Sequence, residues 1–301
     1  MDGLLLVDKP AGMTSHDVVR AVRKIFHTRK VGHAGTLDPL ATGVLPVAVG
    51  NGTKILQFLL AENKSYRATC KLGWTTDTLD CEGKLLQERP VPPLDSSLLE
   101  KLCAEFRGTI DQLPPMYSAL KQNGVPLYKL ARQGKTVERA SRSVTISRLD
   151  LLGFDTDQVE IEVDCSKGTY IRSLVHDLGE KLGCGACLST LRRLRSGDFH
   201  LAECRTLEAL RGMADPALSL LSLEVALRAY PAVTLTDKAA AALRCGIPPQ
   251  LEETAIDRDL PPGTQVRLQV AGELAAMARF APQRDKEKRG DFELLRVFVS
   301  H

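Results

Sequence analysis

Apolar residues run almost unbroken over residues 3–7 and 44–49, which predicts two buried strands. Between them, Thr14 or Ser15 caps a segment with apolar positions at helical spacing, and this predicts a helix through His27. Polar and apolar residues alternate over residues 66–72 and 158–165, as in half-exposed strands. Similar signals predict helices over residues 54–60, 96–106, 126–132, 169–182, 216–229 and 236–244, strands over 143–152, 264–270, 273–280 and 293–300, a hairpin turn at Asn123-Gly124, and a loop over 28–43.

The order of these elements predicts an α+β fold. Hairpins replace repeated βαβ units, so we expect a mixed, largely antiparallel sheet flanked by helices. After about residue 210 the pattern changes, and Tyr230-Pro231 is followed by short strands separated by Gly, Pro and charged turns. We therefore expect two domains, residues 1–229 and a small β-rich module over residues 230–301.

Charge is uneven along the chain, although 40 Lys and Arg against 37 Asp and Glu leave a net charge of only +3. Residues 18–37 hold five basic residues and no acidic one, and residues 121–148 hold seven basic residues with Glu138 alone opposing them. A solvated surface is the common explanation of such runs. They would equally serve as strips that face phosphates.

The sequence shows no apolar run of transmembrane length and no leader with a basic start and a cleavage site, so we expect a cytoplasmic protein. Its eight cysteines are then reduced thiols. Cys184 and Cys187 are closely spaced, but no second close pair completes a zinc site and no thioredoxin-like context surrounds them. We expect neither a metal nor a redox function for this pair.

Residues 32–43 carry the strongest chemical signal. Asp38 is a lone carboxylate that closes the first basic segment, and Pro39 holds it in an extended conformation. Glycines at 32, 35 and 43 let the backbone bend sharply or approach a ligand closely. A surface turn is the plain alternative, but a carboxylate at this place could also meet a polyanion drawn in by the basic residues.

This segment, Gly-His-x-Gly-x-Leu-Asp-Pro-x-Ala-x-Gly, closely resembles the catalytic motif of the TruB family of tRNA pseudouridine synthases. Further stretches resemble the family's other motifs in the same order, from about residue 3 to residue 210. They are Asp8-Lys9-Pro10-Ala11-Gly12-Met13-Thr14-Ser15, Lys64-Ser65-Tyr66-Arg67-Ala68, Thr76-Asp77-Thr78-Leu79-Asp80-Cys81-Glu82-Gly83, Ser166-Lys167-Gly168-Thr169-Tyr170-Ile171-Arg172-Ser173-Leu174 and Leu191-Arg192-Arg193-Leu194-Arg195-Ser196-Gly197. The resemblance implies the pseudouridine synthase fold with a C-terminal PUA-like RNA-binding module.

The resemblance implies a catalytic trio of Asp38, Tyr66 and Arg172. Asp38 is the nucleophile, and since burial alone would raise its pKa, it needs a cation beside it. Arg172, one turn into a predicted helix, is that cation. Tyr66 would stack on the target uracil and is a candidate for the C5 proton transfer. Packing alone would otherwise explain Tyr66, and a surface position would explain Arg172.

The resemblance also implies a set of positioning residues. His33 would enter the space left by the flipped nucleotide, and Lys9 would support the catalytic loop. Leu191 would form an apolar wall of the uracil pocket, with plain core packing as the alternative. The remaining expected RNA-binding or positioning residues are Lys54, Asp80, Tyr170 and Arg192, and for Arg192 solvation is the alternative to phosphate contact.

The function implied is isomerisation of uridine to pseudouridine at position 55 in the T loop of tRNA, by a monomer without an obligate protein partner, metal or cofactor. One alternative is an RNA-binding or tRNA-folding protein, which need not keep the catalytic trio. Another is a guide-RNA-dependent synthase subunit, which long charged terminal extensions would favour. An aspartate-based glycosidase would need a second carboxylate, for which Asp80 is the nominee.

Overall fold

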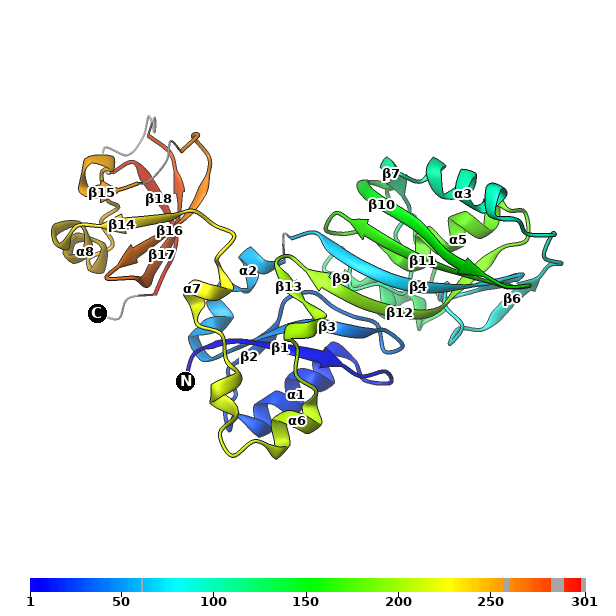
Figure 1. Ribbon diagram of the computed structural model, residues 1–301, viewed down its shortest axis with the longest axis horizontal. Helices are drawn as coiled ribbons and strands as arrows, with labels where there is room; N and C mark the ends of the chain where they lie inside the picture. Colours follow the sequence, from blue (N-terminus) through cyan, green and yellow to red (C-terminus); the bar gives the residue numbers. More distant parts are fainter. Residues whose placement is uncertain (61, 257–259, 283–289, 299–301) are drawn as a thin grey trace.

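The computed structural model describes residues 1–60, 62–256, 260–282 and 290–298 (Figure 1). In this range the main sheet has nine strands, in the order β1-β3-β12-β4-β11-β10-β7, with β2 beside β3 and β13 beside β12. The β3–β12 pair is parallel and the other pairs are antiparallel. The strands are β1 (Gly3–Lys9), β2 (Val31–His33), β3 (Thr42–Val49), β4 (Lys64–Leu72), β7 (Gly108–Gln112), β10 (Arg142–Phe154), β11 (Gln158–Cys165), β12 (Ala186–Ser196) and β13 (Phe199–His200). The predicted α+β fold with a largely antiparallel sheet is confirmed.

Three helices pack against the apolar side of this sheet. α1 (Ser15–Ile25) begins at Thr14, whose side chain accepts a hydrogen bond from the Asp17 backbone N–H, and it contacts β2. α3 (Ser96–Glu105) contacts β10, and α5 (Ile171–Lys181) contacts β12 and β4 (Figure 1). Their buried residues join those of the strands in one continuous core. The described chain also has α2 (Leu56–Leu59), α4 (Leu127–Ala131), α6 (Leu207–Gly212), α7 (Leu223–Ala226) and the 3-10 turns Gly50–Ile55, Leu201–Glu203, Pro216–Ser219 and Leu251–Glu253.

The predicted helix over residues 216–229 is wrong. A 3-10 turn over Pro216–Ser219 and the short helix α7 stand there instead. Between them, Leu221 exchanges two backbone hydrogen bonds with Leu4, with N–O distances of 2.8 and 2.9 Å. Pairing with the edge of β1 satisfies backbone groups that a helix would use internally, and it ends the helical path.

Several other predicted elements differ in extent. The helix over residues 54–60 is a 3-10 turn followed by the single turn of α2, and the loop over residues 28–43 contains β2. Three features were not predicted from the sequence: β12 in the middle of the sheet, β7, and the β5–β6 hairpin (Trp74–Thr76 and Leu85–Glu88). The Asn123-Gly124 turn is confirmed, between β8 (Lys121–Gln122) and β9 (Val125–Pro126).

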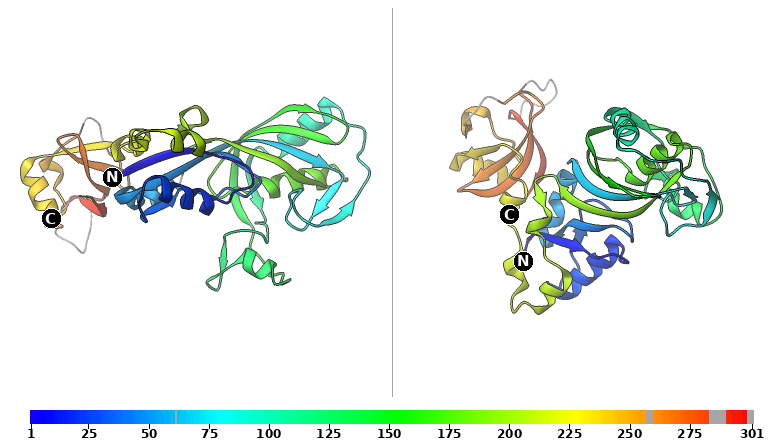
Figure 2. Two further views of the ribbon diagram at one scale, coloured as in Figure 1. Left: turned by 90° about the horizontal axis from the view of Figure 1, so that it is seen from below. Right: turned by 45° about the vertical axis from the view of Figure 1, so that its right-hand side comes forward.

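A second sheet follows the last helix of the first part, in the order β15-β14-β16-β17-β18. Its strands are β14 (Ala232–Leu235), β15 (Thr254–Ala255), β16 (Gln265–Val270), β17 (Glu273–Phe280) and β18 (Phe292–Val297), with α8 (Asp237–Arg244) beside them. Part of the strand predicted to residue 300 lies outside the described residues. This sheet stands at one end of an elongated molecule (Figures 1 and 2). Leu274 and Met277 of β17 pack into one apolar cluster with Leu4 and Phe58, so the two parts share a packed contact.

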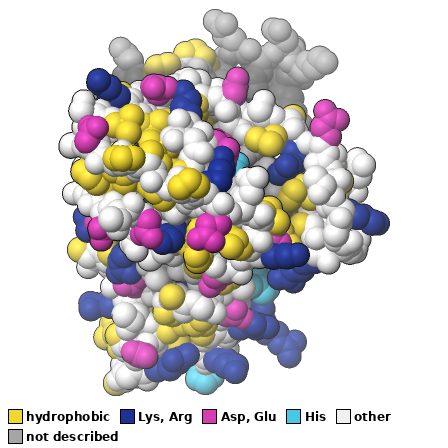
Figure 3. Space-filling view, turned by 90° about the vertical axis from the view of Figure 1, so that its right-hand side faces the viewer, with side chains coloured by type: hydrophobic (Ala, Val, Ile, Leu, Met, Phe, Trp, Pro, Cys, Tyr) yellow, Lys and Arg dark blue, Asp and Glu magenta, His cyan; other side chains and the backbone are white. Residues whose placement is uncertain are grey.

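The surface at the opposite end of the molecule mixes both charges with apolar patches, as the small net charge suggests (Figure 3). Within the described ranges, none of the helices combines the length and the apolar character needed to span a membrane.

Candidate active site

The loop between β2 and β3 carries Asp38, and hydrogen bonds from Lys9 and Ser15 in the N-terminal segment hold it in place. Lys9 is fully buried, and its ammonium donates to the carbonyls of Pro10, Met13 and Pro39 at 2.9, 2.6 and 3.2 Å. The Ser15 hydroxyl accepts from the Leu37 N–H at 2.8 Å. Burial lowers the pKa of Lys9 to about 8. These contacts hold the residues on both sides of Asp38.

Asp38 and Arg172 form an ion pair across the site. Arg172 Nε lies 2.9 Å from Asp38 Oδ2, and Arg172 Nη2 donates to Asp38 Oδ1 at 3.3 Å. Arg172 lies in the first turn of α5 and is only 4% exposed, whereas the Asp38 side chain is 32% exposed. A cation is disfavoured at a helix N-terminus. The carboxylate therefore accounts for the position of this arginine, as the sequence predicted.

The rest of the Arg172 guanidinium is also occupied. Nη1 donates to the Thr78 carbonyl and Nη2 to the Tyr117 carbonyl, both at 2.7 Å. Asp80 Oδ2 lies 3.6 Å from Nη1 on the side away from Asp38. With its donors held on several sides, the guanidinium has little freedom to turn away from Asp38.

Asp80 lies inside the protein. It is 6% exposed, and its Oδ1 accepts from the Thr78 hydroxyl at 2.6 Å and from the Glu82 N–H at 3.2 Å. The resemblance placed Asp80 near the RNA, but the structure turns its carboxylate inward toward Arg172. A second carboxylate facing the same cation also raises the pKa of Asp38 by charge repulsion.

Burial is the largest influence on Asp38 and raises its pKa above the ordinary value of 3.8. The Arg172 guanidinium opposes this shift, and Lys9 adds a smaller effect in the same direction as Arg172. The Asp38 carboxylate is thus partly withdrawn from water, is still reachable from solvent, and has a cation beside it. This combination favours a nucleophile, because the cation keeps the carboxylate ionised while its exposed part can reach a substrate.

A cavity of about 270 Å³ opens over this ion pair. Asp38 and Arg172 line it together with Tyr66, Tyr170, Leu191 and Arg193. Tyr66 lies on β4, opposite Val163 and Arg193 in the neighbouring strands, and is 7% exposed. Burial raises the pKa of its hydroxyl, which stays protonated at neutral pH. The volume is near the lower end of small-molecule sites, about 300 Å³.

Arg193 is a buried residue of the cavity lining, a place that the sequence did not predict, since phosphate contact or solvation were the expectations for this arginine. It is 1% exposed, with Nε donating to the Val44 carbonyl at 2.6 Å and Nη2 to the Gly35 carbonyl at 3.2 Å. Its positive charge lowers the pKa of Tyr66 against the larger effect of burial. A Cβ at Gly43 would fall 2.2 Å from the Arg193 carbonyl, so the glycine in the motif permits β12 to approach. Recognising β12 as a strand would have placed Arg193 near Tyr66.

Two family models match the chain. The N-terminal domain of TruB family pseudouridylate synthase matches residues 23–171, and the tRNA pseudouridylate synthase B C-terminal domain matches residues 172–227. The chain is 53% identical over 300 residues to tRNA pseudouridine synthase B of Syntrophotalea carbinolica, covering 99% of this chain and 98% of that protein. The chain belongs to the TruB family.

Three further comparisons agree with TruB membership. The protein of the same name from Geobacter sulfurreducens is 45% identical, covering 99% of this chain and 100% of that protein. A solved Cbf5-Nop10-Gar1 complex contains a chain 30% identical to this one, with a TM-score of 0.78, covering 99% of this chain and 85% of that chain. An H/ACA RNP bound to a substrate RNA containing 2′-deoxyuridine contains one at 27% identity and a TM-score of 0.76, with the same coverage. The predicted family is confirmed.

The remaining residues expected from the TruB motifs lie in different places. Tyr170 and Leu191 line the cavity, and the Tyr170 ring also lies 4.8 Å from the guanidinium carbon of Arg142. His33 is half-buried and is the last residue of β2, whereas the sequence predicted a loop at this position. Burial, with the nearby charges of His16 and Arg193, lowers its pKa, so the imidazole is neutral at pH 7.

Lys54 and Arg192 lie outside the cavity lining. The Lys54 ammonium is 5.8 Å from the ring centre of Phe298, next to the second sheet. Arg192 pairs with Asp8 at 2.8 Å and donates to the Thr42 hydroxyl at 3.2 Å, and it borders a separate hollow of about 290 Å³ together with Lys9. Neither residue contacts the Asp38–Arg172 pair.

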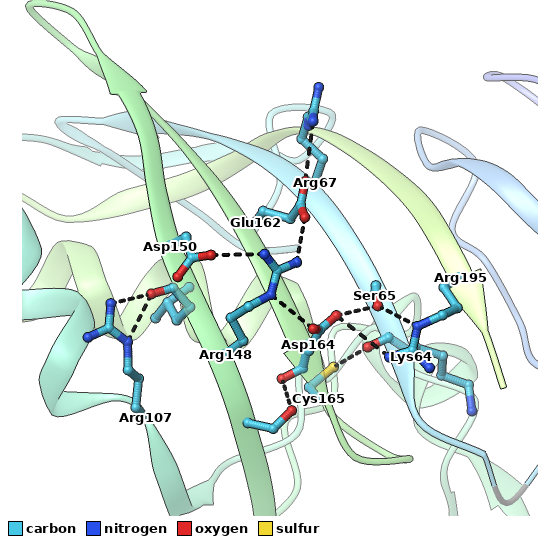
Figure 4. A network of polar contacts seen from close by, with 12 residues as sticks. Lys64, Ser65, Arg67, Arg107, Arg148, Asp150, Glu162, Asp164, Cys165 and Arg195 are labelled. Atoms are coloured by element: carbon cyan, nitrogen blue, oxygen red, sulfur yellow. Dashed lines mark hydrogen bonds and ion pairs between the residues drawn. The ribbon is translucent and has the colours of Figure 1, made fainter. Parts of the chain in front are cut away.

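A polar network covers the other face of the sheet behind Tyr66 (Figure 4). Arg148 contacts Asp150 and Asp164, each at 2.9 Å, and Glu162. Ser65, the neighbour of Tyr66, accepts from Arg195 Nε at 3.0 Å and also bonds to Asp164. The network joins β4, β10, β11 and β12 by side chains, and it fixes the strand that carries Tyr66.

Proposed function

We propose that this chain isomerises uridine to pseudouridine at position 55 in the T loop of tRNA. The observation that carries the proposal is the Asp38–Arg172 ion pair at the base of a cavity that Tyr66 also lines. The full-length relatives named tRNA pseudouridine synthase B support tRNA as the substrate. The uridine in a folded T loop is stacked, so it must be flipped out to enter the cavity.

The reaction breaks the bond between ribose C1′ and N1 of the base, and it joins C1′ to C5. Asp38 is the nucleophile, and Arg172 keeps its carboxylate ionised and oriented. Tyr66 and Leu191 line the cavity and enclose the uracil while it turns. Because burial keeps the Tyr66 hydroxyl protonated, stacking on the uracil fits this side chain better than accepting the C5 proton. Product and substrate have the same atoms and oxidation level, so the chemistry itself requires no redox cofactor.

A projecting segment, residues 113–141, is a candidate RNA contact, and we call it the basic arm (Figure 2). Its base is tied to α5, because the Ser173 hydroxyl donates to the Leu113 carbonyl at 2.8 Å and Arg172 donates to the Tyr117 carbonyl. Lys121, Lys129, Arg132 and Lys135 are exposed on it. Phosphate contacts from these side chains would position the RNA over the cavity.

We also propose that the protein acts as a cytoplasmic monomer without an obligate protein partner. The solved relatives in H/ACA assemblies share 27–30% identity with this chain, against 45–53% for the relatives named for tRNA. This difference favours tRNA over a guide RNA. A tRNA-folding protein would not need an ionised carboxylate in a pocket that must admit RNA.

The test uses a T-arm stem-loop labelled with tritium at uridine C5. The wild-type protein releases tritium, whereas Asp38→Asn releases none and still binds the stem-loop, because the amide is no nucleophile and the phosphate contacts remain. A stem-loop with cytidine at the target position is the substrate control. Tritium release by Asp38→Asn at the wild-type rate would refute the assignment.

A further inference from the structure

Two cysteine thiols from distant parts of the chain are in contact beside the active site. The sulfurs of Cys81 and Cys187 lie 3.2 Å apart. Cys81 is exposed, in the turn after Asp80, and Cys187 is fully buried on β12. The catalytic scheme above uses neither thiol. In the sequence, spacing associates Cys187 with Cys184 alone, and for that pair no redox function is expected.

Backbone hydrogen bonds hold the two thiols together. The Leu188 N–H donates to the Leu79 carbonyl at 3.0 Å, and the Cys81 N–H donates to the Leu188 carbonyl at 2.9 Å. Asp80 and Leu188 thereby form a parallel bridge, with Cys81 and Cys187 directly beside it. The backbone therefore keeps the two residues close together, and their side-chain rotamers bring the sulfurs into contact.

The environments of the two thiols differ in the way that disulfide chemistry requires. The hydrogen bond with Cys187 lowers the pKa of Cys81 to about 7, so a large fraction of Cys81 is thiolate at neutral pH. The same hydrogen bond, with burial, raises the pKa of Cys187. An exposed thiolate reacts with oxidants, and a buried thiol in contact with it resolves the product. Within the described ranges no cluster of three metal-ligating side chains includes this pair.

We propose that Cys81 and Cys187 are a peroxide-sensitive dithiol whose disulfide ties the Asp80 turn to β12. The Cys81 thiolate attacks hydrogen peroxide, giving a sulfenic acid and hydroxide. The Cys187 thiol then attacks that sulfur, and the S–S bond forms as water leaves. The two cysteines together lose two electrons and the peroxide gains them.

The disulfide would act on the catalytic site through Arg172, and this part rests on the proposed function. Cys81 follows Asp80, which faces Arg172 at 3.6 Å, and the Thr78 carbonyl in the same turn accepts from Arg172 at 2.7 Å. Drawing Cys81 onto Cys187 moves this turn toward β12. We expect the turn to loosen its hold on the guanidinium and so to slow the chemical step until the bond is reduced.

The first experiment follows the thiols alone. Reduced full-length protein is treated with a small excess of hydrogen peroxide, alkylated under denaturing conditions and digested. We expect a linked peptide pair containing Cys81 and Cys187. In Cys187→Ser, whose hydroxyl can still hydrogen-bond to Cys81 but cannot form a disulfide, dimedone should instead trap a sulfenic acid at Cys81. Cys245→Ser, which removes another exposed thiol, is the matched control and should still form the bond. Free thiols at both positions after oxidation of the folded wild type would overturn the proposal.

The second experiment measures tritium release under single-turnover conditions before oxidation, after oxidation and after reduction with dithiothreitol. We expect a several-fold loss of rate in wild type and Cys245→Ser, full recovery on reduction, and no loss in Cys81→Ser. An unchanged rate in protein shown to carry the disulfide would overturn the regulatory part. Absence of release from fully reduced wild type would refute the proposed function instead, while the linked peptide would still identify the dithiol.

Discussion

At the scale of single residues, the ion pair between Asp38 and Arg172 determines at which pH the site works. Asp38 must be ionised to act as a nucleophile, and burial raises its pKa above 3.8. Activity should therefore fall as the pH drops through this raised pKa, at a higher pH than an exposed aspartate would give. Single-turnover rates measured across the acidic range give the pH at which activity falls, which is the acidic limb of the pH–rate profile.

Arg172→Lys should move the acidic limb to higher pH and lower the maximal rate by about 10- to 150-fold. Lysine keeps the charge but cannot contact both carboxylate oxygens, and charge-assisted hydrogen bonds contribute about 1.5–3 kcal/mol. With a weaker counter-charge, the pKa of Asp38 rises further. An acidic limb at the wild-type position, together with a full rate, would contradict the pairing.

Lys9 provides a second residue-scale prediction, for stability. Lys9→Met takes the ammonium away from three carbonyls, of which the Pro39 carbonyl still accepts from the Gly12 N–H at 2.9 Å. We expect the free energy of unfolding to fall by about 3 kcal/mol, since each of the two other carbonyls, once unsatisfied, costs about 1–3 kcal/mol. Urea unfolding measures this, with exposed Lys101→Met as the control. An equal effect of the two substitutions would show that the buried contacts are unimportant.

The loss of unfolding free energy in Lys9→Met should also depend on pH. The pKa of Lys9 is about 8 in the folded chain and 10.5 when unperturbed, so the unfolded chain binds more protons between these values. Stability contributed by Lys9 therefore rises from about pH 8 toward 10.5. The difference in unfolding free energy between wild type and Lys9→Met should widen across this window, and a constant difference would contradict the lowered pKa.

At the scale of elements, the sequence predicted the helices and strands whose pattern is local. The cap at Thr14, the alternation on β4 and β11 and the turn at Asn123-Gly124 all have causes within a few residues. The strand β12 was not predicted, because its three arginines resemble an exposed, phosphate-facing segment. In the fold, β4 and β3 flank it, and Arg193 is buried by contacts with Val44 and Gly35. These partners are about 150 residues away in sequence.

The site shows the same division between local and distant causes. The motifs gave Asp38, Tyr66 and Arg172, and the structure brings all three to one cavity. The surroundings of Asp80 and His33 could not be predicted from the motifs, because they depend on the approach of Arg172 and on the pairing of β2 with β3. The contact of Cys81 with Cys187 joins residues 106 apart and had no sequence signal.

The basic arm is the element on which RNA affinity should depend. Replacing Lys129, Arg132 and Lys135 with Gln should raise the tRNA concentration needed for half-saturation while the single-turnover rate at saturation stays close to wild type. The slope of log affinity against log salt should shrink by about 0.7–0.9 for each phosphate contact removed. Neutralising Lys84 and Lys101, which are exposed elsewhere, is the control. An unchanged salt slope would exclude the arm from the RNA interface.

At the scale of the whole molecule, the cavity is complete without the second sheet. The cavity-lining residues identified in the described chain end at Arg193, whereas the second sheet begins at Ala232. The two parts nevertheless share an apolar cluster through Leu274 and Met277, and the Tyr230 hydroxyl donates to the Phe58 carbonyl at 3.0 Å. The second part is therefore expected to add RNA contacts and stability, with the chemistry left to the first part.

A chain that ends at residue 231 tests this division. It keeps the Tyr230 contact but loses Leu274 and Met277 from the apolar cluster that contains Leu4 and Phe58, so its thermal midpoint should fall. If circular dichroism shows it folded, it should need more tRNA for saturation, with a shallower salt dependence, because fewer counterions are released on binding. Its single-turnover rate at saturation should stay near that of the full chain. A folded truncated protein that binds tRNA as tightly as the full chain, yet has lost the chemical step, would show that the second sheet contributes to catalysis and not to binding.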